Sequence, residues 1–243
     1  MSAREQATHA RNGDGCALVT GGTRGIGAAI AQRLRDDGFT VATLARSGGD
    51  VQADVADAAA VQDAFAAVRE RFGPVLVLVN NAGVRQDGLA IRMAAEDWDT
   101  VLGTNLSGAF HCTRRALDDM LSARWGRIVN VSSTSVREPI QGLALSNSNR
   151  MAALGLLNTL AVEVAGDGIT VNTIATGRFG TERLEQMYGS IEAAEEQARA
   201  DVPAGRLGKP QEYGELVAFV CSERAAYLTG AVIPLDGGLT RSS

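Results

Sequence analysis

Residues 16–27 of the chain read CALVTGGTRGIG. The first five residues form a short apolar run that predicts a buried strand, and the residues after the last glycine keep helical spacing up to about Asp37. Glycines between a strand and a helix allow a tight turn and a close approach of the backbone to a pyrophosphate, which binds at the helix N-terminus. An ordinary glycine-rich turn is the alternative. The position between a strand and a helix favours a dinucleotide-binding site.

Apolar runs alternate with longer helical patterns from this turn to the C-terminal end. The runs that predict strands are 16–20, 40–45, 74–79, 127–132, 169–175 and 231–238. The helical patterns that follow the first helix are 58–72, 98–124, 147–165, 181–200 and 210–223. This alternation predicts βαβ units, and the continuous apolar character of the strands predicts a sheet covered on both sides. We therefore expect one doubly wound α/β domain of Rossmann type over residues 15–243, with a parallel sheet and helices on both faces.

The composition is that of a globular protein with an acidic balance. Apolar side chains make up 45 % of the 243 residues and charged ones 21 %, which argues against disorder, and the net charge of −5 argues against a nucleic-acid partner. No apolar run approaches the ~18 residues that span a bilayer. Residues 1–14 lack the apolar stretch of a signal peptide. We expect a flexible tail over residues 1–14 and a cytoplasmic protein without a nucleic-acid or membrane partner.

The cysteines and histidines give no support for a metal site or for disulfides. The three cysteines are Cys16, Cys112 and Cys221, which are far apart and odd in number. This pattern is typical of buried thiols in a reducing compartment. The two histidines show no clustered spacing with the cysteines, so we expect no metal ion.

The end of the second predicted strand indicates which dinucleotide the site takes. An Asp or Glu at this place binds the ribose 2′-hydroxyl of NAD, but the chain reads Ala45-Arg46-Ser47 instead. Arg46, together with Arg24 of the glycine turn, offers planar guanidinium groups that suit a 2′-phosphate. Two solvated surface arginines are the alternative. The absence of an acidic residue and the presence of these two arginines favour NADP(H) as the cofactor.

Several motifs taken together resemble those of short-chain dehydrogenases/reductases. The glycine turn has the spacing Thr-Gly-x-x-x-Gly-x-Gly, residues 80–83 read NNAG, and residues 127–133 read RIVNVSS. Residues 227–230 and 236–238 match as well, so the resemblance covers about residues 15–240. In overall pattern the chain is most similar to the 3-oxoacyl-carrier-protein reductase branch. The resemblance implies a seven-stranded parallel sheet and a substrate lid over about 178–203.

The resemblance also implies roles for individual residues. Asp54 and Val55 match the pair that contacts the adenine, and Asn105 matches the asparagine that holds a water of the proton relay. Ser133 matches the serine that bonds the substrate oxygen, and Thr181 belongs to the segment that touches the nicotinamide. The set expected to bind the cofactor is Thr20, Gly21, Thr23, Arg24, Gly25, Ile26, Gly27, Arg46, Ser47, Asp54, Val55, Asn81, Ala82, Gly83, Arg150, Gly177, Phe179 and Thr181.

The chain departs from this family at the catalytic centre. The family has a tyrosine 13 residues after the serine and a lysine four residues further on, where this chain has Ser146 and Arg150. For Arg150 we expect the hydrogen bond to the nicotinamide ribose that the family's lysine makes, with a surface helix arginine as the alternative. A smaller departure is Thr176, where the family usually has proline.

No other tyrosine or lysine of the chain replaces the missing pair. The lysine Lys209 and Tyr213 lie at the start of a C-terminal helix that the family uses structurally. Tyr227 matches a packing position. Tyr188 falls in the lid segment and would enter the site only if the lid moved. His111 lies on the helix of Asn105, where packing is a better interpretation than catalysis.

The loss of an acid selects among reactions. Hydride transfer to a ketone creates an alkoxide that needs a proton, whereas serine is a poor acid and arginine does not deprotonate in proteins. Hydride addition to a conjugated enone spreads the charge into an enolate, which hydrogen bonds can stabilise. The expected catalytic residues are Ser133, Ser146, Arg150 and Asn105, and Asn147 is a further donor to an oxyanion.

The resemblance extends to a branch of the family in antibiotic pathways that lacks the tyrosine and reduces conjugated enones. Residues 137–139 and 147–148, which read REP and NS, are similar to that branch. The leading hypothesis is an NADPH-dependent oxidoreductase acting on a small carbonyl compound, with enones ahead of ketones. The alternatives are a cofactor-binding protein without turnover and a non-redox lyase or isomerase. The family's usual assembly implies a homotetramer, or a homodimer, formed through the helices of Asn105 and Arg150.

Overall fold

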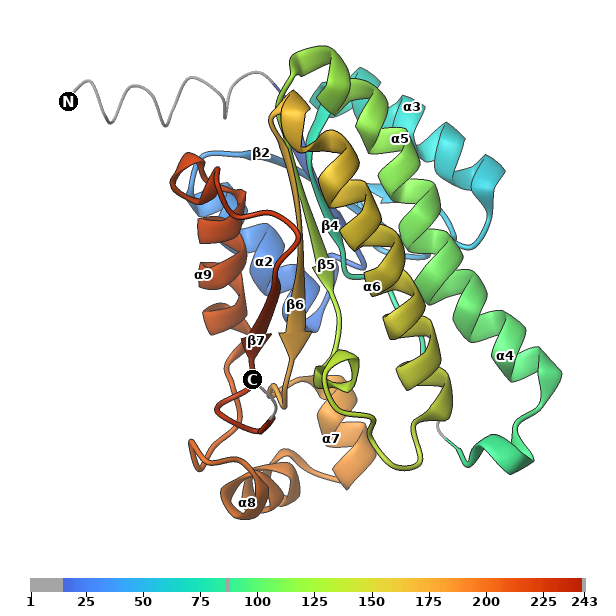
Figure 1. Cartoon of the computed structure of the whole chain (residues 1–243), viewed down its shortest axis with the longest axis vertical. Coiled ribbons are helices and arrows are strands. Elements are labelled where there is room, and N and C mark those ends of the chain that lie inside the picture. The colour runs from blue at the N-terminus through green and yellow to red at the C-terminus, as the bar shows by residue number, and fades with distance from the viewer. Residues whose placement is uncertain (1–14, 86–87, 242–243) are drawn as a thin grey trace.

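The computed structural model describes residues 15–85 and 88–241, and Figure 1 shows a twisted parallel sheet between two layers of helices. The predicted tail over residues 1–14 lies outside the described residues. Within the described chain the sheet has seven strands in the order β3-β2-β1-β4-β5-β6-β7. Their bounds are β1 (Cys16–Thr20), β2 (Thr40–Ala45), β3 (Val51–Gln52), β4 (Val75–Asn80), β5 (Gly126–Val131), β6 (Ile169–Thr176) and β7 (Val232–Leu235). The predicted single Rossmann-type domain with a seven-stranded parallel sheet is confirmed.

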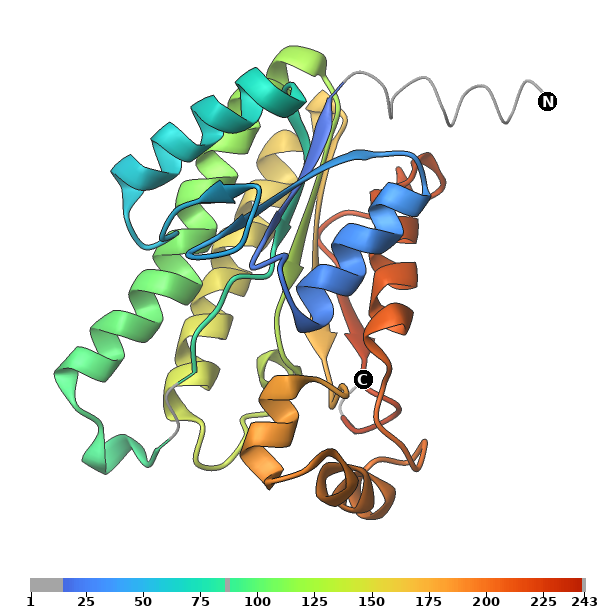
Figure 2. The same ribbon diagram turned by 180° about the vertical axis from the view of Figure 1, so that it is seen from behind.

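Apolar side chains point to both faces of the sheet and form two cores. On one face α3 (Ala58–Phe72), α5 (Gly108–Ala123) and α6 (Ala144–Val164) cover a core that includes Phe65, Met120 and Leu157. On the other face α2 (Gly25–Asp36) and α9 (Pro210–Cys221) cover the second core (Figure 2). The strands β1 and β4 are buried over their whole length because both faces are covered.

The remaining helices stand at the edge of the sheet where the strands end. They are α4 (Ala95–Leu102), α7 (Glu182–Tyr188) and α8 (Ile191–Asp201). Figure 1 shows α7 and α8 beyond the arrowheads of β6 and β7, so the predicted lid segment lies over the carboxyl ends of the strands. The chain runs outward from β1 to β3 and then returns to β4 on the other side of β1. This reversal creates a crevice at the carboxyl ends of β1 and β4, where open α/β sheets bind ligands.

Three local predictions need correction. The strand β3 was not located, because two residues carry no pattern and the strand exists only through pairing with Leu44 and Ala45 of β2. The helix expected over 98–124 begins at Ala95 and contains a π-helical segment, Gly103–Ser107. The helix expected over 181–200 is two helices, because Gly189 adopts a φ of 85° and ends α7.

Candidate active site

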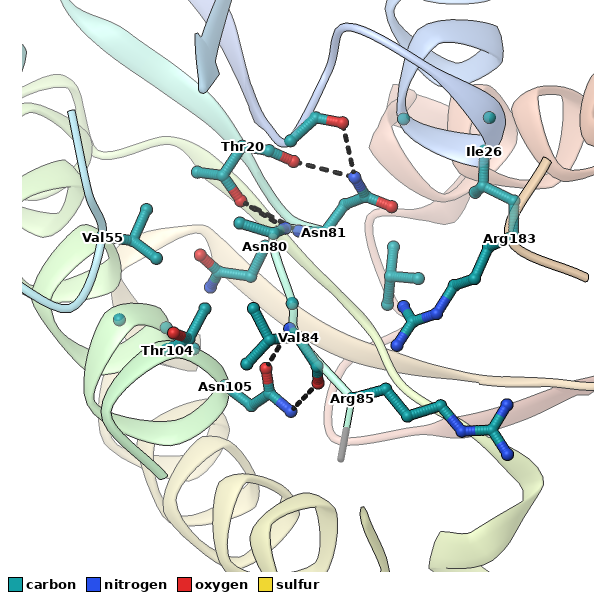
Figure 3. Close-up of a pocket in the computed structure, with 18 of the residues that line it drawn as sticks. Thr20, Ile26, Val55, Asn80, Asn81, Val84, Arg85, Thr104, Asn105 and Arg183 are labelled. Carbon is teal, nitrogen blue, oxygen red and sulfur yellow. Dashed lines mark hydrogen bonds between the residues drawn. The ribbon is translucent and has the colours of Figure 1, made fainter. Parts of the chain in front are cut away.

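A cavity of about 930 Å³ lies at the carboxyl ends of β1, β4, β5 and β6 (Figure 3). Every residue of the predicted cofactor-binding set lines this cavity, and so do the four expected catalytic residues, Asn105, Ser133, Ser146 and Arg150. The sheet thus brings together side chains that are up to 161 positions apart, from Thr20 to Thr181. The individual roles of these residues remain predictions.

The glycine turn leaves an anion site at the start of α2. Gly21 and Gly25 adopt φ angles of 64° and 54°, which favour glycine. Arg24, the N-cap residue, makes no side-chain cap, and the first turn of α2 contains no acidic residue. The N–H groups of this turn therefore have no side-chain acceptor, and they add to the positive end of the helix dipole. These features fit a pyrophosphate.

Thr20 and Asn81 fix the loops after β1 and β4 to each other (Figure 3). The Thr20 hydroxyl donates to the Val79 carbonyl oxygen at 3.2 Å and accepts from the N–H groups of Asn81 and Ala82 at 3.0 Å. The Asn81 amide donates to the carbonyl oxygens of Thr20 and Gly21 at 2.9 and 3.0 Å. Both side chains are therefore engaged in holding the walls of the cavity.

Asn105 lies in the π-helical segment between α4 and α5. Its side-chain oxygen accepts from the Val84 N–H at 2.8 Å, and its side-chain nitrogen donates to the Val84 carbonyl at 2.9 Å (Figure 3). This pair of bonds positions the loop after β4 against the helix. One N–H of the amide and one lone pair of its oxygen are used in this way, so a second N–H and a second lone pair remain for a relay water. Short π-helical segments recur at functional sites.

The end of the cavity beside the carboxyl end of β2 is lined by Arg24, Arg46 and Ser47, which are all exposed. The next acid along the chain, Asp50, faces away from the cavity. Its carboxylate accepts from the backbone N–H and the hydroxyl of Thr43 at 2.9 and 2.7 Å. No acid occupies the place of a ribose-binding Asp or Glu among the described residues of this end. Two guanidinium groups without such an acid fit a 2′-phosphate.

The opposite end of the cavity holds Ser133, Ser146 and Arg150. The Ser133 hydroxyl oxygen accepts from the Ser135 N–H at 3.2 Å, so its hydrogen remains available to a ligand. The Arg150 Nε donates to the Ser146 hydroxyl at 3.1 Å, and its Nη1 donates to the Val131 carbonyl at 3.3 Å. The bond to Ser146 orients its hydroxyl relative to the guanidinium, and all three side chains line the same cavity.

The charge at this end is positive. Burial, together with the nearby guanidinium groups of Arg183 and Arg85, lowers the pKa of Arg150 to about 10, while the charge of Tyr213 acts in the opposite direction. Arg150 therefore remains a cation at neutral pH. Figure 3 shows Arg183 entering the cavity from the side opposite to Thr104 and Asn105. Arg85 and Arg183 were not in the predicted set, although each lies only two residues after a matched position, Gly83 and Thr181.

The proposed role of Asn147 as an oxyanion donor is wrong. Its amide accepts from the Ile140 N–H at 3.2 Å and donates to the Ile140 carbonyl at 2.9 Å, outside the cavity lining. Successive residues of a helix are about 100° apart, so the positions that face the cavity with Ser146 are Asn149, Arg150 and Ala153. Asn149 is buried, and its side-chain oxygen has no hydrogen-bond partner. Helical periodicity could have identified it.

None of the three tyrosines lines the cavity. Tyr188 is half-buried against the small core of Ala194, Ala198 and Leu207, and it does not line the cavity. Tyr213 is fully buried, and its hydroxyl lies 2.9 Å from the hydroxyl of Thr176, which does line the cavity. The interpretation of Tyr213 as purely structural missed this connection.

Two further findings concern the described residues. They include no group of three or more His, Cys, Asp or Glu side chains arranged to hold a metal ion. They also include no helix whose length and apolar character would let it cross a membrane.

Comparison with known proteins supports one family. The profile described as enoyl-(acyl carrier protein) reductase matches residues 21–240. The 3-oxoacyl-acyl-carrier-protein reductase MabA of Mycobacterium tuberculosis is 40 % identical over 228 residues, which are 91 % of each chain. The acetoacetyl-CoA reductase of Rhizobium meliloti is 38 % identical over 236 residues, covering 91 % of this chain and 97 % of that one.

The fold agrees with this assignment. The solved structure of the aldohexose dehydrogenase of Thermoplasma acidophilum superimposes with a TM-score of 0.89 at 28 % identity and covers 96 % of both chains. The chain therefore belongs to the short-chain dehydrogenase/reductase family, as an oxidoreductase related to the 3-oxoacyl-acyl-carrier-protein reductases.

Proposed function

We propose that the protein is an NADPH-dependent reductase of a small carbonyl compound, a conjugated enone or a ketone, in a biosynthetic pathway. The observation that carries this proposal is one cavity with an uncapped helix N-terminus at its centre and Ser133, Ser146 and Arg150 at one end. The names of MabA and of the acetoacetyl-CoA reductase support a carbonyl substrate.

The residues of the cavity fit NADPH along its length. The first turn of α2 would hold the pyrophosphate, and Arg24 and Arg46 would hold the 2′-phosphate. Gly177 and Thr181 would border the nicotinamide. When bound, the reduced nicotinamide supplies a hydride to the substrate carbon.

The side chains at the reacting end are donors to an oxygen that gains charge. The family's catalytic tyrosine and lysine are replaced by Ser146 and Arg150, one turn apart on α6. Neither is an effective acid near neutral pH, but both can donate hydrogen bonds, as can Ser133. Preorganised donors of this kind stabilise the charge of an enolate. This reasoning places conjugated enones ahead of ketones.

A substrate panel tests the proposed function. The purified protein is mixed with NADPH and a set of cyclic enones, each with its saturated ketone, and absorbance at 340 nm is followed with the masses of the products. We expect turnover with the enones. NADPH consumption matched to product excludes a lyase or isomerase. Tight binding of NADPH without turnover on either set would overturn the reductase and support a cofactor-binding protein.

Cofactor preference tests the 2′-phosphate site. We expect Arg46→Ala to weaken NADPH binding by about 10- to 100-fold, since a hydrogen bond to a charged group contributes about 1.5–3 kcal/mol. NADH binding, measured by nicotinamide fluorescence, should stay unchanged. The control is Arg199→Ala, which removes an exposed arginine of α8 whose ion pair with Glu195 is weak. Equal losses for NADPH and NADH would contradict the assignment of Arg46.

The assembly into a homotetramer or a homodimer stays a prediction. Large apolar side chains are exposed on the outer faces of α5 and α6, among them Phe110, Met151 and Val162. An exposed apolar patch of this kind supports pairing of these helices between subunits.

A further inference from the structure

Thr176 and Tyr213 form a hydroxyl pair in the wall of the cavity. Thr176 is the last residue of β6 and lines the cavity, whereas Tyr213 belongs to α9 on the far side of the sheet. The two hydroxyl oxygens are 2.9 Å apart. The Tyr213 ring is held by Phe179, with the ring centroids 5.2 Å apart at an angle of 71°. The pair therefore connects a buried phenol to the space in which a substrate would lie.

The burial of Tyr213 decides which hydroxyl donates. Tyr213 is 0 % exposed, so its hydrogen has to find an acceptor within the protein, and the Thr176 oxygen is the partner in the structure. The opposite arrangement would leave the phenol hydrogen buried without an acceptor, which is costly. When Tyr213 donates, the hydrogen of Thr176 is free to point into the cavity, because Thr176 is only half-buried.

The register of the sheet places Thr176 beside Ser133. Val131 of β5 pairs with Ile174 of β6, and Ser133 and Thr176 each follow two residues beyond that pair. Neighbouring parallel strands are about 4.8 Å apart. Ser133 keeps an extended backbone, so both residues stay at adjacent strand ends. One substrate oxygen placed between them can accept from both hydroxyls.

We propose that Tyr213, acting through Thr176, supplies the proton for reduction of a ketone in this cavity, an inference that rests on the proposed reductase function. As hydride from the reduced nicotinamide bonds to the carbonyl carbon, the carbonyl oxygen takes up the electron pair of the broken π bond. That oxygen receives the proton of Thr176, and Thr176 receives the proton of Tyr213. After the alcohol leaves, water in the open cavity returns a proton to Tyr213 through Thr176.

The chemistry of the pair suits this direction of transfer. Burial raises the pKa of Tyr213, although the hydrogen bond with Thr176 and the charge of Arg150 oppose the rise. The phenol is therefore protonated at working pH. An alkoxide is a stronger base than a phenolate, so proton transfer from Tyr213 is favourable even with the raised pKa of the phenol. An enolate is a weaker base than an alkoxide, so enone reduction depends less on this proton. Arg150 stabilises the phenolate that forms.

Paired ketone and enone kinetics test the relay. Tyr213→Phe and Thr176→Val should each lower kcat for a ketone by about 10²-fold or more, as expected for loss of a general acid, and the double variant should lose no more than either alone. The rate with the matched enone should fall much less. Thr176→Ser keeps the hydroxyl and should retain ketone reduction. Tyr188→Phe is the control for loss of a tyrosine outside the cavity.

The relay can also be tested without turnover, by following the ¹⁹F signal of a labelled Tyr213. The chain has three, so labelling with 3-fluorotyrosine gives three ¹⁹F signals, and Tyr213→Phe identifies the one of interest. In the presence of NADP⁺, which cannot reduce the ketone, adding ketone should shift the Tyr213 signal in the wild type and leave it in place in Thr176→Val. Thermal melting checks that each variant is folded.

The outcomes separate the relay from the function on which it rests. Ketone rates in folded Tyr213→Phe equal to the wild type would overturn the relay while leaving the reductase function intact. Equal losses with ketone and enone would show a structural role for Tyr213. A wild type that reduces enones and never ketones would also refute the relay. Absence of any reductase activity would remove both proposals.

Discussion

Replacing Gly27 by alanine is expected to weaken NADPH binding by about 10- to 100-fold and to lower the melting temperature. A Cβ at this position would overlap the carbonyl oxygen of Gly21 and lie 2.5 Å from the side-chain nitrogen of Asn81. That nitrogen holds the loops after β1 and β4 together, so the new methyl group has to push both loops apart. Overpacking of this kind typically costs about 1–3 kcal/mol of stability, and affinity falls because the displaced turn no longer presents its N–H groups to the pyrophosphate.

Gly166→Ala is the matched control for this prediction. Gly166 is exposed, its φ is not positive, and a Cβ there would meet no atom within 4 Å. We expect this variant to bind NADPH and to melt like the wild type. Nicotinamide fluorescence and thermal melting measure both properties. Wild-type affinity in Gly27→Ala would mean that the turn does not hold the cofactor.

Replacing Ser133 by alanine is expected to lower kcat by about 10²–10³-fold, the usual effect of losing one oxyanion donor. The Ser133 oxygen already accepts from the Ser135 N–H, so its own hydrogen serves the cavity. The variant also loses this bond to the backbone, which should lower stability by about 1 kcal/mol. NADPH affinity should stay unchanged, because the loss concerns the substrate oxygen.

Ser135→Ala gives the matched control two residues further along. The Ser135 hydroxyl is buried without a hydrogen-bond partner, and Ser135 does not line the cavity. Its removal should change neither kcat nor the melting temperature appreciably. Steady-state kinetics with the best substrate of the panel compare the two variants. Similar rates in Ser133→Ala and Ser135→Ala would exclude Ser133 from the chemistry.

The local pattern of the chain was sufficient to predict the doubly wound parallel fold and the glycine turn, and the family resemblance supplied about half of the residues that line the cavity. The strand–glycine–helix order of residues 16–27 defines a right-handed βα unit whose N–H groups meet an anion, and this depends only on neighbours in the sequence. The continuous apolar strands specify a sheet covered on both faces. The carboxyl ends of parallel strands meet at one edge, so the motifs that follow those strands had to gather there.

The prediction of the polar residues of α6 that face the cavity was partly wrong. Asn147 and Asn149 are both polar residues of one helix turn, but Asn149 shares the helix face of Ser146 and Arg150 and lines the cavity, whereas Asn147 bonds to Ile140. The helix over 181–200 failed for a local reason, since Gly189 tolerates a positive φ that composition alone does not reveal.

The contact between Thr176 and Tyr213 belongs to tertiary structure alone. The two residues are 37 positions apart, on a strand and on a helix that covers the other face of the sheet. Sequence spacing shows which residues share one element, but the distance between elements depends on how the side chains of both cores pack. The amino-acid pattern therefore sufficed for the dinucleotide fold, whereas the donors available at its reacting end were decided by the packing of α6 and α9.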